Sequence, residues 1–282
     1  MSRSRIFQIY YDDATRAGLD PDFEPFDNLS NEQPLWREYL PMRRFFESNT
    51  LEDDCYYGFL SPKFHAKTGL TGRQVRQFVE GQGNADVVTF SPYPDQAALY
   101  FNVFEQGENV HPGIAETAQE FFRVIGMPTE LHHLVMDGRN TVYCNYFVAK
   151  ASFWKRWNRI LGECMRHAAE ASSPLHGRLN AMTTHNYRPI LMWVMMMERL
   201  TSVLLTRSDE FSVANYPSFR LHLDDMRLQG HATDLIALEA VKRSYIDSRD
   251  PYFMRSFRTC QFRLMQACGV RAVVFQSVCG LA

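Results

Sequence analysis

The sequence contains no apolar run long enough to cross a lipid bilayer. Its most apolar segment, residues 190–197, is followed at once by Glu198 and Arg199, whereas a membrane-spanning helix needs about 20 mostly apolar residues. The first five residues are mostly polar and lack the long apolar region of a secretory signal. We therefore expect a cytoplasmic protein, and we leave open peripheral association with the inner face of a membrane.

Basic blocks and metal-binding cysteine pairs are missing as well. The formal net charge is -2 and no long run of lysine and arginine occurs, so we expect no nucleic-acid partner. No two cysteines form a C-x-x-C pair, and no histidine pair lies near them at zinc-finger spacing. We expect reduced core thiols. The cysteines are Cys55, Cys144, Cys164, Cys260, Cys268 and Cys279.

Glycine is absent from residues 10–17, directly after the first strand-like segment. A methyltransferase-type α/β enzyme would need a glycine-rich loop there, so this class is disfavoured. The composition is otherwise ordinary, with 45% hydrophobic and 22% charged residues in 282 residues, which is enough to bury a substantial core.

Strand-like and helix-like segments alternate along the chain. Such alternation predicts an α/β fold with a mostly parallel central sheet flanked by helices. We expect one catalytic domain over residues 1–210 and a helical C-terminal extension, residues 211–282, packed on it. Strands are predicted near residues 5–11, 54–60, 86–90, 141–148 and 210–216, and helices near residues 71–79, 114–125, 150–171, 190–205 and 233–267. Ser30 is predicted to cap a further helix after the first strand.

Several short motifs occur in a fixed order between residues 5 and 206. They read D-N-L-S-N at 27–31, Y-Y-G-F-L-S at 56–61, Y-C-N-Y-F-V-A-K at 143–150 and E-R-L at 198–200, with His111 in a loop between the second and third. The ordered set resembles a family of bacterial glycosyltransferase-like proteins often encoded with capsule or lipopolysaccharide synthesis enzymes.

The resemblance implies a GT-A-like single-domain fold and a nucleotide-sugar donor. It also implies transfer of the sugar to a saccharide or lipid-linked acceptor in surface polysaccharide synthesis. The alternative is a non-catalytic subunit of a polysaccharide-assembly complex that binds a nucleotide-sugar or a glycan.

Glycosyl transfer from a nucleotide-sugar needs positive charge beside the leaving diphosphate. Many GT-A enzymes supply it with Mn²⁺ or Mg²⁺ held by a D-x-D motif at the end of a central strand. Here that strand ends in Ser61-Pro62-Lys63, and the literal D-x-D, Asp20-Pro21-Asp22, falls in the loop after the first strand. The metal ligands are therefore unassigned, and both a metal site and a metal-independent site using Lys63 or the Arg43-Arg44 pair stay open.

The end of the first strand is the expected position of the nucleoside. Tyrosine rings can stack on a base and carboxylates can bind ribose hydroxyls, so Tyr10, Tyr11 and Asp12 are donor-binding candidates. An ordinary strand end with a capping carboxylate is the alternative. Asp27 and Asn28 are further donor-binding candidates, because the family resemblance includes them.

Five further candidates lie beyond the third predicted strand, and three of them, Asn145, Glu198 and Arg199, interrupt apolar segments. Asn145 lies in an apolar strand-like run and Arg199 in the most apolar helix-like run; both are donor-binding candidates, and both could instead satisfy internal partners. Glu198 is a candidate catalytic residue, with an internal ion pair to Arg199 as the alternative. Asp95 and His111 are also candidates for deprotonating the acceptor hydroxyl, and each could instead order its own loop.

Overall fold

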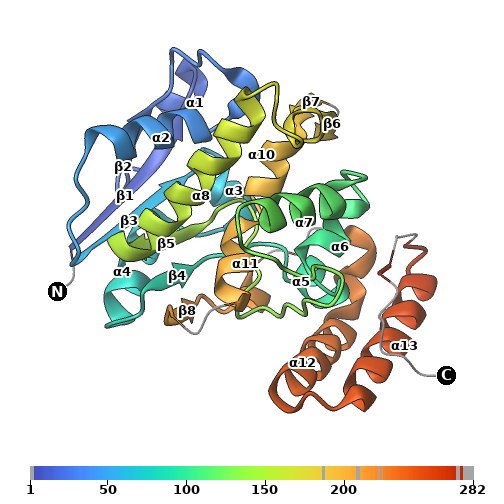
Figure 1. Ribbon diagram of the computed structural model, residues 1–282. Helices are drawn as coiled ribbons and strands as arrows, with labels where there is room; N and C mark the ends of the chain where they lie inside the picture. The colour runs from blue at the N-terminus through green and yellow to red at the C-terminus, as the bar shows by residue number, and fades with distance from the viewer. Residues whose placement is uncertain are drawn as a thin grey trace.

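The fold is a mixed α/β domain built on a six-stranded sheet, shown in the computed structural model of Figure 1. The structure describes residues 3–185, 188–207, 210–221, 223, 225–270 and 274–275. The strand order is β2-β1-β3-β5-β4-β8. The strands are β1 Arg3–Tyr10, β2 Glu24–Asp27, β3 Cys55–Leu60, β4 Val87–Thr89, β5 Phe147–Lys150 and β8 Val213–Asn215, and a separate hairpin is formed by β6 Met182–His185 and β7 Arg188–Leu191.

The sheet is mostly parallel, as the alternation of the sequence predicts. β1 pairs in parallel with β2 and β3, and β4 pairs in parallel with β8. Only β5 runs the other way, between β3 and β4. This confirms the predicted fold class, a mostly parallel sheet flanked by helices.

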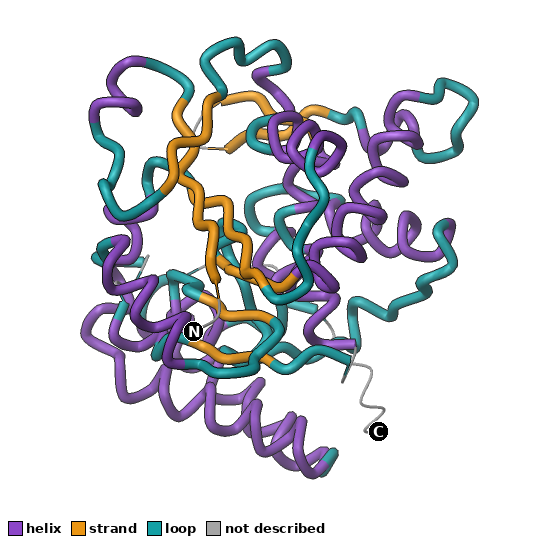
Figure 2. The backbone as a smooth tube through the Cα atoms, turned by 90° about the vertical axis from the view of Figure 1, so that its left-hand side faces the viewer, coloured by secondary structure: helices purple, strands orange, loops and turns teal. Residues whose placement is uncertain are grey.

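Alternate side chains of the strands pack into two separate clusters, one on each face of the sheet. Phe7 and Phe59 belong to one cluster, together with Trp154. Ile6 and Leu60, their neighbours in sequence, belong to the other. Because successive strand residues point to opposite faces, helices must cover both sides. Figure 2 shows the strands running through the middle of the molecule with helices on both sides.

The helices that cover the sheet differ in length and in position. α2 and α8 pack on the face of Phe59, and α3 and α4 on the face of Leu60. The α-helices are α1 Asp13–Ala17, α2 Tyr39–Ser48, α3 Phe64–Thr68, α4 Gly72–Gly81, α5 Pro94–Leu99, α6 Val103–Glu108, α7 Ile114–Val124, α8 Ala151–Ala169, α9 His176–Leu179, α10 Met192–Met197, α11 Leu200–Arg207, α12 Ala232–Ser248 and α13 Pro251–Ala267. The described residues also form the 3-10 helices η1 Pro34–Trp36, η2 Ser218–Arg220 and η3 Met226–His231.

Three predicted elements differ from the structure. The strand expected over residues 141–148 is β5, which begins only at Phe147, because Cys144 and Asn145 adopt positive φ angles of 63° and 54°. The helix expected over residues 190–205 is two helices, α10 and α11, that separate at Glu198 and Arg199. Ser30 caps no helix: the residue before α2 is Glu38.

The C-terminal part of the chain is helical, as predicted, but it also completes the sheet. β8 lies beyond residue 210 and pairs with β4, while α12 packs on α5 and α13 packs on α12. Figure 1 shows α12 and α13 side by side at the edge of the molecule. In the part of the chain that the structure describes, no helix has the length and apolar character that crossing a membrane requires.

The described cysteines are free thiols, in agreement with the sequence. Cys55 and Cys164 are buried and Cys144 is partly buried. Two lie closer to solvent than a core thiol would, since Cys260 is exposed and Cys268 is partly buried. Cys279 lies outside the described residues.

Candidate functional site

A pocket of about 680 Å³ opens where β1 and β3 end. Its walls come from four regions: the segments that follow β1 and β2, the segment that follows β3, the turn before β5, and the β6–β7 hairpin with α10. The carboxyl ends of neighbouring parallel strands meet at one edge of a sheet, and ligands of open α/β sheets bind outside that edge. The pocket therefore has the position expected of a ligand site.

The first wall consists of Tyr11, Asp12 and Asn28. Tyr11 is 40% exposed, so its ring is available to stack on a planar ligand. Asp12 caps α1: its Oδ1 accepts hydrogen bonds from the backbone N and the Oγ1 of Thr15, both at 2.7 Å. Among the described residues only this oxygen is occupied, so Oδ2 can accept a hydrogen bond from a ligand hydroxyl.

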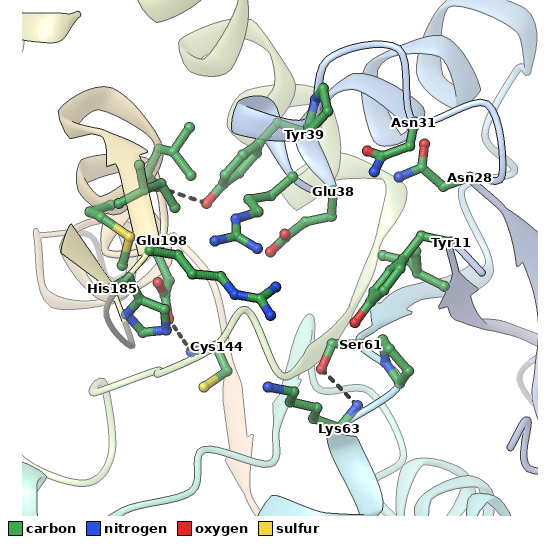
Figure 3. Close-up of a pocket in the computed structure, with 18 of the residues that line it drawn as sticks. Tyr11, Asn28, Asn31, Glu38, Tyr39, Ser61, Lys63, Cys144, His185 and Glu198 are labelled. Atoms are coloured by element: carbon green, nitrogen blue, oxygen red, sulfur yellow. Dashed lines mark hydrogen bonds between the residues drawn. The ribbon is translucent and has the colours of Figure 1, made fainter. Parts of the chain in front are cut away.

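The second wall is the segment that follows β3. Ser61, Lys63 and Lys67 line the pocket, and Figure 3 shows Ser61 and Lys63 at its lower side. The Ser61 Oγ lies 2.6 Å from the hydroxyl of Tyr146. Lys67 follows Lys63 by four residues, in α3, so the two side chains lie on the same side of one helical turn. The segment thus brings two ammonium groups to the end of the central strand.

The third wall is the turn before β5, and Cys144 is its central residue. The Cys144 backbone N donates to Glu198 Oε1 at 3.0 Å, and its Sγ accepts from Lys67 Nζ at 3.0 Å. A positive φ angle is uncommon for residues other than glycine and marks local strain. Here Cys144 and Asn145, two consecutive non-glycine residues, adopt it. In this conformation Cys144 contacts both the Glu198 carboxylate and the Lys67 ammonium.

Glu38 and Glu198 bring two carboxyl groups into the same pocket. Burial raises the pKa of Glu38, and the nearby charge of Glu198 raises it further. Beside them, the Tyr39 hydroxyl donates to Val194 O at 3.3 Å and accepts from Asn145 Nδ2 at 3.0 Å. Burial and a like charge both disfavour the ionised form of a carboxyl group, so the Glu38 carboxyl is shifted toward its neutral form.

The β6–β7 hairpin contributes His185 and Arg188 to the pocket. Behind His185 lies His111, whose ring is stacked on it at a centroid distance of 6.1 Å. His111 is buried, and its Nδ1 lies 3.1 Å from Thr183 Oγ1. Burial, with the Arg199 charge nearby, lowers the pKa of His111 to about 3, so its ring is neutral at pH 7.

The pocket brings together five of the candidates that the sequence predicts. They are Tyr11, Asp12, Asn28, Lys63 and Glu198. Two more lie just behind its walls. Asn145 bonds Tyr39 as described above, and Tyr10 is buried with its hydroxyl hydrogen-bonded to Asp27.

The remaining four candidates do not line the pocket. The carboxylate of Asp27 also accepts from the backbone N of Leu29 at 2.8 Å. Asp95 and His111 are buried, and Asp95 accepts from the backbone N of Asp225 at 3.0 Å. Arg199 is buried and donates to three oxygens, which are Val103 O, Met195 O and Gln106 Oε1 at 2.9, 2.7 and 3.1 Å.

The literal D-x-D and the Arg43-Arg44 pair are likewise absent from the pocket lining. Asp20 Oδ2 accepts from Gly72 N at 2.7 Å and its Oδ1 from Asp22 N at 2.9 Å, so this carboxylate orders its own loop. Arg43 pairs with Glu47, and Arg44 pairs with Glu32. Within the described ranges, no three His, Cys, Asp or Glu side chains are grouped as metal ligands.

Sequence reasoning missed several residues that line the pocket. They are Arg37, Glu38, Lys67, Cys144, His185 and Arg188. One signal was available for Lys67: it repeats the charge of Lys63 at helical spacing directly after the central strand. Arg37, with a φ angle of 52°, and the hairpin residues give no such signal, because only the tertiary fold brings them to the pocket.

Comparison with known proteins gives one distant likeness. No protein-family model matches the chain, and no curated protein matches it. Among solved structures, the chain is similar to the apo structure of WbbM, a bifunctional glycosyltransferase, with 16% sequence identity and a TM-score of 0.41. The alignment covers 76% of this chain and 44% of WbbM, so the chain spans less than half the length of that protein. This likeness is too distant to transfer residue roles.

Proposed function

We propose that this protein is a glycosyltransferase that moves a sugar from a nucleotide-sugar donor to a saccharide or lipid-linked acceptor. The observation that carries the proposal is the composition of the pocket at the ends of β1 and β3. An aromatic ring, hydroxyl-binding groups, lysines and a fixed carboxylate lie together there. These are the groups that a base, a ribose, a diphosphate and an acceptor hydroxyl need.

The nucleoside is assigned to the wall formed by Tyr11, Asp12 and Asn28. The Tyr11 ring supplies a stacking surface, and Asp12 Oδ2 and the Asn28 amide supply hydrogen bonds to ribose hydroxyls. Ribose hydroxyls donate well to carboxylates, and Asp12 is held by its bonds to Thr15. The donor is therefore expected to lie along the end of β1 with its diphosphate toward β3.

The acceptor hydroxyl is assigned to Glu198. Its Oε1 accepts from Cys144 N, which fixes the carboxylate in the pocket. In the transfer step the acceptor oxygen bonds to the anomeric carbon, and the bond from that carbon to the diphosphate breaks with its electron pair left on the diphosphate. The acceptor proton passes to the Glu198 carboxylate. Of the three predicted catalytic residues, Glu198 is the one in the pocket lining.

A thermal-shift screen tests the donor claim. The probes are UDP, GDP, ADP, CDP and dTDP, their nucleosides and commercially available nucleotide-sugars, each with Mn²⁺ and with EDTA. A ligand present at about 100 times its Kd stabilises the native state by about 2.7 kcal/mol, which raises the melting temperature. We expect such a shift for at least one nucleoside diphosphate. No shift with any probe in either condition would contradict the proposal.

A second measurement separates an enzyme from a binding subunit. The nucleotide-sugar that gives the largest shift is incubated with the protein, and the released nucleoside diphosphate is quantified over time. We expect slow hydrolysis, because water can replace the acceptor at Glu198. Binding without any release, with or without added oligosaccharide acceptors, would support the non-catalytic alternative instead.

A further inference from the structure

Lys67 carries a charge that no carboxylate in the described part of the chain neutralises. It is partly buried in α3 and lines the pocket. Its Nζ donates to the Sγ of Cys144 and lies 5.6 Å from the ring centroid of Tyr93 and 5.8 Å from that of Tyr146. An ammonium has three N–H donors, and the thiol takes only one of them.

Two of the side chains that contact Lys67, Cys144 and Tyr146, carry no negative charge at neutral pH. Burial raises the pKa of the Cys144 thiol to about 12 and that of the Tyr146 phenol above its ordinary value. Both groups are therefore neutral at pH 7. Aromatic faces attract a cation, but a partly desolvated ammonium gains more from an anion with hydrogen-bonding oxygens. The surroundings of Lys67 thus leave room for an anionic ligand.

Several cations near the pocket, apart from Arg37 and Arg188 of its lining, differ from Lys67 in this respect. Arg43 and Arg44 are paired with glutamates on the surface, and Arg199 is occupied by two backbone carbonyls and an amide. Lys63 shares the wall with Lys67 and, among the described residues, forms no ion pair, but its side chain is exposed. A solvated ammonium holds an anion less firmly than a partly desolvated one.

We propose that Lys67 is the residue that binds the diphosphate of the donor, with Lys63 as a second, solvent-exposed contact. The inference rests on the proposed function and deepens it, because it assigns the group that neutralises the leaving diphosphate. Cys144 fixes the geometry, since its backbone N holds the Glu198 carboxylate and its Sγ orients Lys67 Nζ. Glu198, assigned to the acceptor, and Lys67, assigned to the leaving diphosphate, are therefore both bonded to Cys144.

Titration calorimetry of three proteins tests this assignment. Wild type, Lys67→Met and the control Lys155→Met are titrated with the nucleoside diphosphate that gives the largest thermal shift and with its nucleoside, in EDTA. Lys155 is exposed in α8 and pairs with Asp53 on the surface. A hydrogen-bonded contact to a charged group supports about a 10-fold to 100-fold affinity difference. We expect Lys67→Met to lose that factor for the diphosphate, to bind the nucleoside unchanged, and Lys155→Met to match wild type.

Amine labelling of the unmodified protein gives a test that does not depend on a folded variant. Lys67 and Lys155 are acetylated with a limiting reagent, with or without ligand, and the rates are compared by mass spectrometry. We expect the diphosphate to slow labelling of Lys67 and the nucleoside to leave it unchanged, with Lys155 unaffected by either.

The two ways of failing are distinguishable. If wild type binds a nucleoside diphosphate but Lys67→Met binds it equally well, or if the diphosphate does not protect Lys67, the assignment of Lys67 is wrong and the proposed function stands. If wild type binds no nucleoside diphosphate in any condition, the proposed function itself is wrong. A diphosphate that binds only with Mn²⁺ would also overturn the role of Lys67, because the metal would then supply the charge.

Discussion

At the scale of single residues, the site depends on a short strained turn. Cys144 and Asn145 adopt left-handed backbone conformations, each of which costs a non-glycine residue about 1–3 kcal/mol. The turn is held by the bond from Cys144 N to Glu198 and by the bond from Asn145 Nδ2 to Tyr39. Strain of this kind at the wall of a pocket is typical of functional sites.

Replacing Glu198 with glutamine should remove the proposed base while keeping the shape of the side chain. The amide oxygen can still accept from Cys144 N, so the turn and donor binding should be unchanged. General-base catalysis contributes about 10²-fold to 10⁴-fold, and we expect Glu198→Gln to lower kcat for sugar transfer by that factor. Steady-state kinetics with the identified donor measures it. A variant with wild-type kcat would show that the base is another group.

The sequence candidates that line the pocket either follow strands β1, β2 and β3 or belong to a charged break in an apolar run. Tyr11, Asp12 and Lys63 could be placed because strand ends are visible in the sequence. Glu38 and His185 could not, because they reach the pocket from the N-cap of α2 and from a hairpin, whose positions depend on long-range packing. In the sequence, Asp95 and Arg199 have the same features as the candidates that line the pocket. Only the structure reveals that their hydrogen-bond partners are internal.

At the scale of secondary-structure elements, buried polar contacts connect the C-terminal helices to the domain. Glu105, at the start of α6, accepts from Arg258 Nη1 at 2.7 Å and from Gln261 Nε2 at 3.2 Å, both in α13. It also accepts from the backbone N atoms of Phe101 and Phe275 at 2.6 and 2.8 Å. One carboxylate thus connects α6, α13 and a segment near the C-terminus.

Glu105→Gln should weaken this connection severely. The substitution leaves the buried Arg258 guanidinium without its counter-charge, and breaking a buried pair in this way costs about 3–5 kcal/mol. We expect a loss of that size in the free energy of unfolding, measured by urea denaturation. The control is Glu120→Gln, which breaks an exposed pair with Arg123 and should cost less than about 1 kcal/mol. Equal effects of the two substitutions would contradict the role assigned to Glu105.

The periodic apolar pattern predicted the existence of most helices but not where they break. Residues 190–205 are almost uniformly apolar, so the pattern gives no reason to divide them. The division at Glu198 arises because this carboxylate accepts from Cys144 N, while Arg199 donates to Val103 O on the other side. Each contact joins residues that are far apart in sequence, which is why a local pattern cannot predict it.

At the scale of the whole molecule, the C-terminal residues are part of the fold rather than an addition to it. β8 forms an edge of the central sheet beside β4. In α12, the buried Lys242 ammonium donates to the carbonyl oxygens of Ala97, Tyr100 and Met136. Leu235 and Leu238 of the same helix are buried in the main core. The sequence predicted a helical extension after residue 210. Its one indication of a sheet strand beyond that boundary was the short strand predicted near residues 210–216.

A chain that ends at residue 210 should therefore fail to fold on its own. Removing residues 211–282 exposes the edge of β4, leaves three buried carbonyl groups without their ammonium donor and uncovers the apolar surface under α12, and each of these changes is destabilising. We expect the 1–210 fragment to aggregate or to melt without a cooperative transition in calorimetry. Co-expression with a separate 211–282 fragment should restore both cooperative melting and the nucleotide-induced thermal shift. A 1–210 fragment that melts cooperatively and binds the same nucleotide would show instead that the first 210 residues are an independent domain.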